Sequence, residues 1–409
     1  MNNKISKSIS IAEQAYKNKD YLKSYSLYKA IYKQQKLQEV LFRLADIALI
    51  GLKKSKIKLI LVSNLIEIGL KNENETKFFT ELIYLKLKLL RDFSKFIQFN
   101  KLYNSIKPEQ QEYAFIEFEY LHYLIETKKY NEAENLLTKI KGKDSIFSKI
   151  TENFFLDKLF FEDIINFKLD TKHDITFYRE NISTDFNYTV VVVGNPDIFE
   201  KEILSFVQSL KKTSSKYLIS ILIHDANTNQ IKLINKSIEN LNFENLCIFF
   251  ENSKILNLDS NATKAYYTAR RYILANDMME RFSKTTFVFD ADYIINNNLN
   301  NYVKLNSEID ISLIIKESFR YLHLTISAGQ TMFNCTENSK LFLNFYKKYM
   351  SYILTYKNMS WHIDQIVMYV AFIILKRFYN AKIISNLNEN NSNNRDCFFY
   401  HTFHGKYKL

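Results

Sequence analysis

Apolar side chains recur every three or four positions from Ile9 to about Asp170, the spacing that gathers them on one face of an α-helix. Only Pro108 and three glycines interrupt this pattern. Helices are expected around residues 40–52, 57–70, 77–99 and 110–127. The pattern therefore predicts an all-helical domain over residues 1–175.

Two stretches of this helical half repeat one another. Tyr21–Ile31 and Tyr130–Ile140 each begin with tyrosine, carry a small residue three positions later (Ser24 and Ala133) and continue with apolar residues at the next turn. They resemble the second helix of a tetratricopeptide repeat, in which the small residue lets paired helices approach closely. Their separation is near three periods of about 34 residues but not equal to them. A protein-binding solenoid and a plain helical bundle are both compatible with this pattern.

The pattern changes at Tyr188, where short apolar, β-branched runs begin to alternate with helical segments. Such runs are typical of parallel strands that are buried on both faces. Strands are predicted at 188–193, 217–223, 246–250 and 286–289, with helices at 198–212, 229–240 and 263–282. The alternation predicts an α/β domain over residues 186–409, with a Rossmann-like, mostly parallel sheet covered by helices on both faces.

Candidate ligand-binding residues follow three of the predicted strands. Gly194 and Asn195 follow the first strand, Asp225 the second and Asp290 the fourth. Ligands of open parallel sheets bind beyond the carboxyl ends of the strands. These residues are therefore candidates for a binding site, and for Asp225 a strand-end cap is an equal alternative.

The strongest chemical signal is Asp290-Ala291-Asp292, which follows an apolar strand. Two carboxylates one residue apart repel each other unless a cation neutralises them. Mg²⁺ and Mn²⁺ prefer carboxylate oxygens and typically bridge them to substrate phosphates. We therefore expect a divalent cation that holds a diphosphate, because the position at the end of a strand argues against a plain surface turn.

Three downstream stretches carry further candidates for the same site. A glycine between short apolar segments allows a close backbone approach, although a strand irregularity would read the same way. An acidic residue at the start of an apolar helix can be a catalytic group or only a cap. Two imidazoles and a cation near the end of the chain can bind a metal ion and a phosphate, or they can lie in a disordered tail. The stretches are Ser327-Ala328-Gly329, Asp364-Gln365 and His401-Thr-Phe-His404-Gly405-Lys406.

Residues from about 186 to 409 resemble a GT-A-type glycosyltransferase, of the glycogenin and lipopolysaccharide-galactosyltransferase kind. The order of the elements carries the resemblance: Val207-Gln-Ser209-Leu210, Tyr267-Thr-Ala-Arg270-Arg271-Tyr272, Asp290-Ala-Asp292, Ser327-Ala328-Gly329 closing with Asn334, Asp364-Gln365, and the tail. The tail departs from the His-x-x-Gly-x-x-Lys pattern of that family, because Gly405 is four residues after His401 and directly follows His404.

The resemblance implies a nucleotide-diphosphate-sugar donor and a divalent cation, Mn²⁺ or Mg²⁺. It implies Asp290 and Asp292 as metal ligands, with His401 or His404 as a third. Because one of two adjacent helical arginines ordinarily faces water, at most one is expected to act. The remaining implied roles are diphosphate contacts from Lys406 and from Arg270 or Arg271, sugar contacts from Ser327, Ala328 and Gly329, nucleotide contacts from Gly194, Asn195 and Asp225, and catalysis by Asp364 and Gln365.

Charge and cysteine content narrow the partners and the compartment. The net charge of +12 is spread over both halves without an arginine-rich tract, so a nucleic-acid partner is disfavoured. The three cysteines lie far apart and suit a reducing compartment. The amino terminus lacks a signal-peptide core, and the longest apolar run, 366–375, is too short to span a membrane. We expect a cytoplasmic bacterial protein with at most peripheral contact at the inner membrane face.

Two other functions compete with sugar transfer. An apolar strand followed by Asp-x-Asp also occurs in haloacid-dehalogenase-type phosphatases, where the first aspartate is the nucleophile. Those domains begin with that strand, whereas three predicted strands precede it here, and Tyr293-Ile294 replaces the usual Gly-Thr. A non-catalytic scaffold with a degenerate transferase fold is the second alternative. The sequence leaves the acceptor open between a surface glycan, a lipid-linked sugar and a protein, and the helical domain is a candidate for binding a protein partner.

Overall fold

The computed structural model describes residues 3–18, 20–51, 55–71, 77–143, 151–168, 175–182, 185–243, 245–253, 258–315, 325–356, 363–386 and 397–401. The chain divides into two compact units, Met1–Thr151 and Glu152–Leu409. The first unit is helical and the second is built around a β-sheet. The predicted change from an all-helical to an α/β pattern is therefore confirmed.

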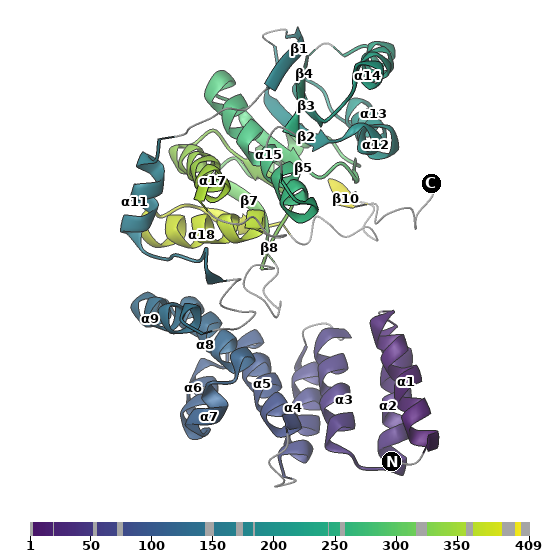
Figure 1. Ribbon diagram of the computed structural model, residues 1–409, viewed down its shortest axis with the longest axis vertical. Helices are drawn as coiled ribbons and strands as arrows, with labels where there is room; N and C mark the ends of the chain where they lie inside the picture. The colour runs from purple at the N-terminus through teal and green to yellow at the C-terminus, as the bar shows by residue number, and fades with distance from the viewer. Residues whose placement is uncertain are drawn as a thin grey trace. The chain divides into compact units, whose positions relative to one another are not determined.

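The described part of the first unit consists of helices, most of which pack against the next helix in the sequence (Figure 1). They are α1 (Asn3–Lys17), α2 (Tyr21–Gln34), α3 (Gln38–Gly51), α4 (Lys56–Leu70), α5 (Lys77–Asp92), α6 (Phe96–Ser105), α7 (Pro108–Gln111), α8 (Ala114–Glu126) and α9 (Tyr130–Lys141).

The two repeated sequence segments each begin at the first residue of a helix. Tyr21 is the first residue of α2 and Tyr130 the first residue of α9. Ser24 is fully buried, and its hydroxyl donates a hydrogen bond to the carbonyl of Ala12 in α1, at 2.9 Å. Ala133 is also fully buried. The small residues therefore lie where helices pack closely, while the assignment to tetratricopeptide repeats stays a prediction.

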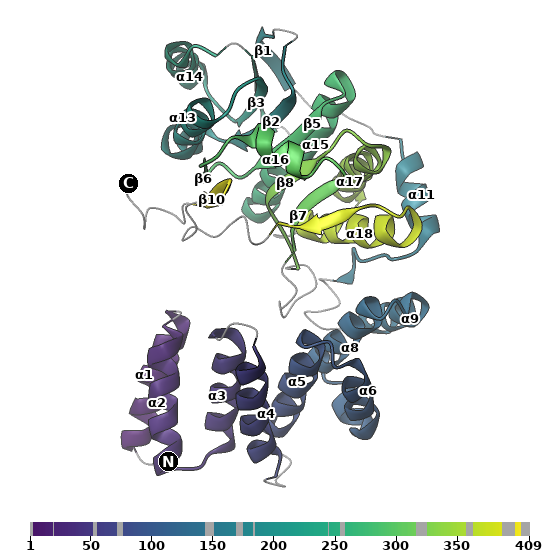
Figure 2. The ribbon, with the colours of Figure 1, turned by 180° about the vertical axis from the view of Figure 1, so that it is seen from behind.

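The second unit alternates strands and helices along the chain (Figure 2). Its strands are β1 (Ile175–Asn181), β2 (Tyr188–Gly194), β3 (Tyr217–His224), β4 (Leu246–Glu251), β5 (Thr285–Phe289), β6 (Tyr293–Ile295), β7 (Ile311–Ile315), β8 (Ile326–Phe333), β9 (Ile383–Ser385) and β10 (Phe399–His401). Its helices are α11 (Lys158–Asn166), α12 (Pro196–Ile198), the π-helix Phe199–Ile203, α13 (Leu204–Thr213), α14 (Thr228–Leu241), α15 (Ser260–Phe282), α16 (Leu299–Leu305), α17 (Glu337–Tyr356) and α18 (Ile363–Phe378).

Eight strands form one sheet in the order β1-β4-β3-β2-β5-β8-β7-β9. The four strands predicted from the sequence, β2 to β5, are mutually parallel, as expected. The flanks add antiparallel pairs, because β1 runs against β4 and β8 runs against both β5 and β7. Helices α13 and α14 cover one face, and α15, α17 and α18 the other, which explains why β2 and β3 are buried along their whole length (Figures 1 and 2).

Helix α11 belongs to the sheet unit. Phe161 in α11 stacks on Phe345 in α17 with ring centroids 4.4 Å apart, and the carbonyl of Ile165 accepts a hydrogen bond from Lys348. The predicted limits, 1–175 and 186–409, place this helix with the helical half, whereas the compact units divide after Thr151. Its apolar side chains have their partners on helices that come much later in the sequence, so local pattern does not reveal this grouping.

A search of the described helices for membrane spans finds none with the length and apolar character needed to cross a bilayer.

Candidate functional site at the carboxyl ends of the strands

Asp290, Ala291 and Asp292 connect β5, a central strand of the sheet, to β6. The backbone N–H of Asp290 donates to the carbonyl of Gly329 in β8 at 2.7 Å, so the first aspartate is held by the neighbouring strand. The Asp290 side chain remains 36% exposed, and Asp292 is half-buried. Both carboxylates therefore lie at the carboxyl end of a parallel strand, where α/β sheets bind ligands.

The two adjacent arginines of α15 reach different strand ends. Arg271 Nη1 donates a hydrogen bond to Asp290 Oδ1. Arg270 Nε donates to Glu251 Oε2 at the end of β4, at 3.0 Å. Both residues are buried, so the expectation that one of them faces water is wrong. Arg271 is the arginine that contacts the predicted metal-binding pair.

Gly329 packs directly against this carboxylate. A Cβ atom at this position would lie 3.0 Å from Asp290 Oδ2 and 3.0 Å from the hydroxyl of Tyr293. The pairing of β7 with β8 is irregular here, because Leu313 faces Thr331 while Ile314 faces Ser327, which leaves residues 328–330 without counterparts on β7. The backbone at Gly329 therefore lies close to the Asp290 side chain, while the expected approach to a ligand stays a prediction.

One short segment of α15 ties four strands together at this edge of the sheet. Residues 266–272 cover two helical turns, so their side chains spread around the helix and reach different strands. The contacts are Tyr266 and Arg270 with Glu251 in β4, Tyr267 with Asp225 after β3, Arg271 with Asp290 after β5, and Tyr272 with the carbonyl of Ala328 in β8. Sequence reasoning found the arginines but missed the three tyrosines.

Asp225 is fixed by neighbours on both sides. Its backbone φ is 57°, in the left-handed region. Its carboxylate accepts hydrogen bonds from the amide of Ser253 at 2.8 Å, the hydroxyl of Ser253 at 2.7 Å and the hydroxyl of Tyr267. Burial would raise the pKa of Asp225, but the hydrogen bonds from Tyr267 and Ser253 outweigh it and hold that pKa below its ordinary value. These contacts favour the strand-end alternative for Asp225.

Glu251 is a buried carboxylate that the sequence analysis missed. Its Oε2 lies 3.0 Å from His224 Nδ1, and its Oε1 accepts from the hydroxyl of Tyr266 at 2.9 Å. Burial raises the pKa of Glu251, but the contact with His224 and the charge of Arg270 outweigh it and lower that pKa to about 2. Glu251 ends an apolar strand, as Asp290 follows one, so the same strand-end rule could have identified it.

Gly194 and Asn195 are accounted for by the turn from β2 into α12. A Cβ atom on Gly194 would lie 2.8 Å from Cγ2 of Ile198, so only glycine fits. The side chain of Asn195 caps α12 by accepting a hydrogen bond from the amide of Ile198 at 2.9 Å. Their predicted nucleotide contacts stay a prediction.

Asp364 and Gln365 begin α18, and Asp364 is buried. Burial raises the pKa of Tyr346 well above its ordinary value, and the charge of Asp364 adds to this shift. Burial likewise raises the pKa of Tyr272 to about 12, and the charge of Asp364 adds to this shift. The ring centroid of Tyr272 lies 4.9 Å from that of Tyr346, and Tyr272 follows Arg271, the arginine that contacts Asp290.

The last described strand, β10, lies beside the segment that follows the aspartate pair. Strand β10 pairs antiparallel with β6, and His401 is opposite Tyr293, which directly follows Asp292. The backbone therefore brings one of the two predicted tail histidines beside the aspartate pair. His404 and Lys406 lie outside the described residues.

The residues present fit a hard divalent cation in part. Asp290 and Asp292 offer the carboxylate oxygens that Mg²⁺ and Mn²⁺ prefer. Arg271 already offsets the charge of one of them. Three potential His, Cys, Asp or Glu ligands do not come together anywhere in the described part of the chain. A cation at this position would thus need further oxygens from a substrate, or a ligand from the tail.

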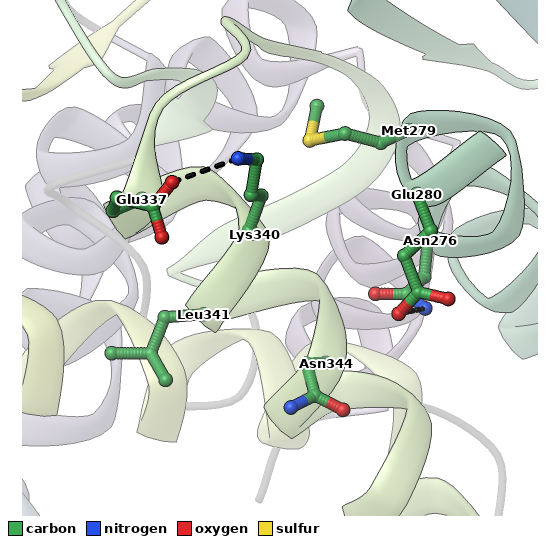
Figure 3. A pocket seen from close by; sticks show the side chains of 7 residues that line it. All are labelled: Asn276, Met279, Glu280, Glu337, Lys340, Leu341 and Asn344. Atoms are coloured by element: carbon green, nitrogen blue, oxygen red, sulfur yellow. Dashed lines mark hydrogen bonds and ion pairs between the residues drawn. The ribbon is translucent and has the colours of Figure 1, made fainter. Parts of the chain in front are cut away.

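A pocket of about 270 Å³ lies elsewhere, between α15 and α17 (Figure 3). It is lined by Asn276, Met279, Glu280, Glu337, Lys340, Leu341 and Asn344, and it includes none of the predicted site residues. Four of its polar residues form two pairs: Lys340 lies 2.7 Å from Glu337, and Asn276 donates to Glu280 at 2.7 Å.

No protein-family model matches the chain, and no curated protein matches it in sequence. Among solved structures, the chain is similar to the apo form of mouse xyloside xylosyltransferase 1, with a TM-score of 0.35 and 9% identity over 55% of this chain and 100% of that chain. It is similar to the apo structure of the bifunctional glycosyltransferase WbbM, with a TM-score of 0.36 and 12% identity over 56% of this chain and 48% of that chain. It is also similar to the glycosyltransferase GlyE of Streptococcus pneumoniae, with a TM-score of 0.34 and 13% identity over 55% of this chain and 57% of that chain.

The chain thus spans about half the length of WbbM and of GlyE. At these TM-scores the similarities carry no functional argument, and the proposal below rests on the residues of this chain.

Proposed function

We propose that the unit Glu152–Leu409 is a glycosyltransferase that moves a sugar from a nucleotide-diphosphate sugar with the help of Mn²⁺ or Mg²⁺. One observation carries the proposal: Asp290 follows a central parallel strand and meets both Arg271 and Gly329. These are the three elements that the GT-A-like motif order predicts to share one site. A surface turn would not require a buried arginine and a glycine at the same carboxylate.

The charges at this edge suit a pyrophosphate. A divalent cation held by Asp290 and Asp292 would supply positive charge against the negative charge that develops on the leaving nucleotide. Arg271 is buried and planar, and it would hold a phosphate or Asp290 in a fixed direction. His401 or His404 would complete the metal site, and Lys406 would contact phosphate as a point charge.

Asp364 is the proposed carboxylate nearest the transferred sugar, with Gln365 beside it. Buried at the start of α18, Asp364 can orient a sugar hydroxyl or accept a proton from the acceptor. Ser327, Ala328 and Gly329 would line the sugar from β8. The proposed acceptor is a surface glycan, a lipid-linked sugar or a protein, and the helical unit would bind a protein partner.

The test is hydrolysis of a panel of nucleotide sugars in the presence and absence of Mn²⁺. The wild type should hydrolyse at least one donor only with the metal, and Asp292→Ala should lose about 10²–10³-fold in kcat, as when an electrostatic contact to a transition state is removed. Asp185→Ala is the matched control, because the Asp185 side chain is 74% exposed and pairs with Lys216 at the surface.

Two outcomes would overturn the proposal. Equal turnover by wild type and Asp292→Ala would remove the aspartate pair from the reaction. Release of phosphate from small phosphomonoesters, lost in Asp290→Asn and without hydrolysis of any nucleotide sugar, would instead indicate a phosphatase.

A further inference from the structure

We propose that Glu251 is a positioning residue that, through Arg270 and Tyr266, holds α15 so that Arg271 meets Asp290. This inference rests on the proposed function in assigning a catalytic consequence to the Arg271–Asp290 contact. Arg270 thus fixes the helix to the sheet, and its neighbour Arg271 contacts Asp290 in the proposed site.

The geometry around Glu251 is that of an anchor. Both carboxylate oxygens are used: Oε2 accepts from Arg270 at 3.0 Å and Oε1 accepts from Tyr266 at 2.9 Å. Arg270 and Tyr266 are four residues apart and therefore lie on the same side of α15. His224 adds a third contact from β3, 3.0 Å from Oε2. Glu251 itself is 3% exposed, so no ligand reaches it directly.

The anchor fixes both the rotation and the axial position of α15. Successive helical residues point about 100° apart, so fixing Arg270 determines the direction in which Arg271 leaves the helix. On the side of the site, the Arg271 guanidinium contacts the carboxylate of Asp290, so the direction in which Arg271 leaves the helix decides whether this contact forms. A misplacement of about 1 Å at a reacting centre can cost about 10²-fold in rate.

The charge of Glu251 is part of this role. Arg270 is almost fully buried and would be left without its carboxylate if Glu251 were neutral. A buried arginine without a counter-ion moves toward another anion or toward water. The other carboxylates that this segment of α15 contacts are Asp225 and Asp290, so a displaced Arg270 would compete with Tyr267 or Arg271 for them.

The experiment is a double-mutant cycle between Glu251→Gln and Arg271→Ala, with kcat and KM for nucleotide-sugar hydrolysis as readouts. Glu251→Gln alone should lower kcat about 10-fold to 100-fold with a smaller change in KM. In the Arg271→Ala background the same substitution should have no further effect, because the residue that it positions is gone. Additive losses would overturn the proposal.

Two controls separate positioning from loss of folding. Glu119→Gln makes the same chemical change at a buried glutamate that accepts from a buried arginine at 2.7 Å in the helical unit, and it should leave kcat unchanged. Tyr266→Phe removes only one hydroxyl from the anchor and should show a smaller loss of the same kind. If Glu251→Gln does not fold, the test is made with Tyr266→Phe instead, and an unchanged kcat of Tyr266→Phe would contradict the proposal.

A second readout does not depend on turnover. Nuclear magnetic resonance of ¹³C,¹⁵N-labelled arginine reports rotation of the Arg271 guanidinium, assigned by its absence in Arg271→Ala. Rotation should be hindered in the wild type and in Glu119→Gln, and released in Glu251→Gln. Hindered rotation in Glu251→Gln would overturn the positioning role. Released rotation in a protein that hydrolyses no nucleotide sugar would contradict the proposed function alone.

Discussion

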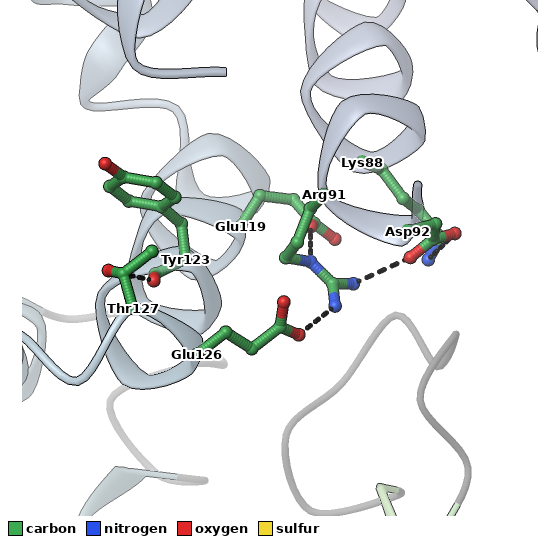
Figure 4. Close-up of polar contacts among 7 residues, drawn as sticks. All are labelled: Lys88, Arg91, Asp92, Glu119, Tyr123, Glu126 and Thr127. Carbon is green, nitrogen blue, oxygen red and sulfur yellow. Dashed lines mark hydrogen bonds and ion pairs between the residues drawn. The ribbon is translucent and has the colours of Figure 1, made fainter. Parts of the chain in front are cut away.

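Each unit of this chain contains a buried arginine cluster, and the two differ in what surrounds the arginine. In the helical unit, Arg91 donates to Glu119 and to Glu126 at 2.7 Å each, and lies 3.3 Å from Asp92 (Figure 4). Among the described residues of the sheet unit, Arg270 and Arg271 each pair with one carboxylate, and the carboxylate of Arg271, Asp290, is 36% exposed. The first cluster joins helices α5 and α8, whereas the second opens toward solvent.

This difference shows which property indicates a binding site. Both clusters combine a buried arginine with glutamate, and the charges of Glu119, Asp92 and Glu126 outweigh burial and raise the pKa of Arg91 further. Buried charge therefore does not distinguish them. Position does, because Asp290 follows a parallel strand at the edge where α/β sheets bind ligands, while Arg91 is surrounded by its own carboxylates.

The largest expected effect is a loss of stability in the helical unit when its buried arginine is replaced. Arg91→Met leaves Glu119 buried without its partner, so the helical unit should lose about 3–5 kcal/mol. Hydrogen exchange of α5 and α8, followed by mass spectrometry, measures this loss, and nucleotide-sugar turnover should not change. Lys129→Met, at an exposed ion pair with Glu132, is the control and should leave exchange unaltered. Lost turnover with unchanged hydrogen exchange would indicate that Arg91 belongs to a functional site, and would contradict the difference drawn between the two clusters.

A smaller effect is expected at the close approach beside Asp290. Gly329→Ala places a Cβ atom 3.0 Å from Asp290 Oδ2 and from the hydroxyl of Tyr293, so the carboxylate must shift by a few tenths of an ångström. Turnover should fall about tenfold, in line with the sensitivity of reacting groups to position. Gly142→Ala is the matched control, because its nearest atoms would be 3.6 and 3.7 Å away. Full activity of Gly329→Ala would show that Asp290 tolerates displacement.

The smallest expected effect is on the unfolding free energy, which should depend on pH with opposite sign for a glutamate of each cluster. The pKa of Glu251 is lowered to about 2, so its stabilisation is present above the unfolded pKa of about 4.3 and is lost as the pH falls toward 2. Burial raises the pKa of Glu126, so this residue binds protons more readily when folded and its unfavourable contribution is relieved on acidification. Urea denaturation between about pH 5 and pH 3 measures the unfolding free energy and separates the contribution of Glu251 from that of Glu126.

The variants give the expected directions. As the pH falls, the unfolding free energy of the wild type should decrease relative to that of Glu251→Gln and increase relative to that of Glu126→Gln. The same direction for both variants would contradict the assigned environments.

The sequence predicts the parts of this molecule that depend on local pattern. The apolar runs of β2 to β5 are visible because parallel strands are buried on both faces, and Asp290 is found because it follows such a run. The meeting of Arg271 with Asp290 depends on the register of α15 against the sheet, which no sequence period encodes. The placement of α11 and the irregular pairing of β7 with β8 likewise arise from contacts between residues far apart in the chain.

The roles of Glu251 and of the three tyrosines, Tyr266, Tyr267 and Tyr272, escaped prediction for the same reason. Each residue alone looks like an ordinary strand end or helix position, and only the packed structure brings them together. Gly194 and Asn195 also follow a strand, and packing and helix capping account for both residues, while their predicted nucleotide contacts stay a prediction.

Calorimetric titration of nucleoside diphosphates into the wild type and Asp292→Ala, with and without Mn²⁺, tests the central claim most directly. The account predicts that at least one nucleotide binds the wild type only when the metal is present, and that Asp292→Ala loses this metal-dependent binding while remaining folded. Nucleotide binding that is equal in both proteins, or absent from the wild type at saturating Mn²⁺, would contradict it.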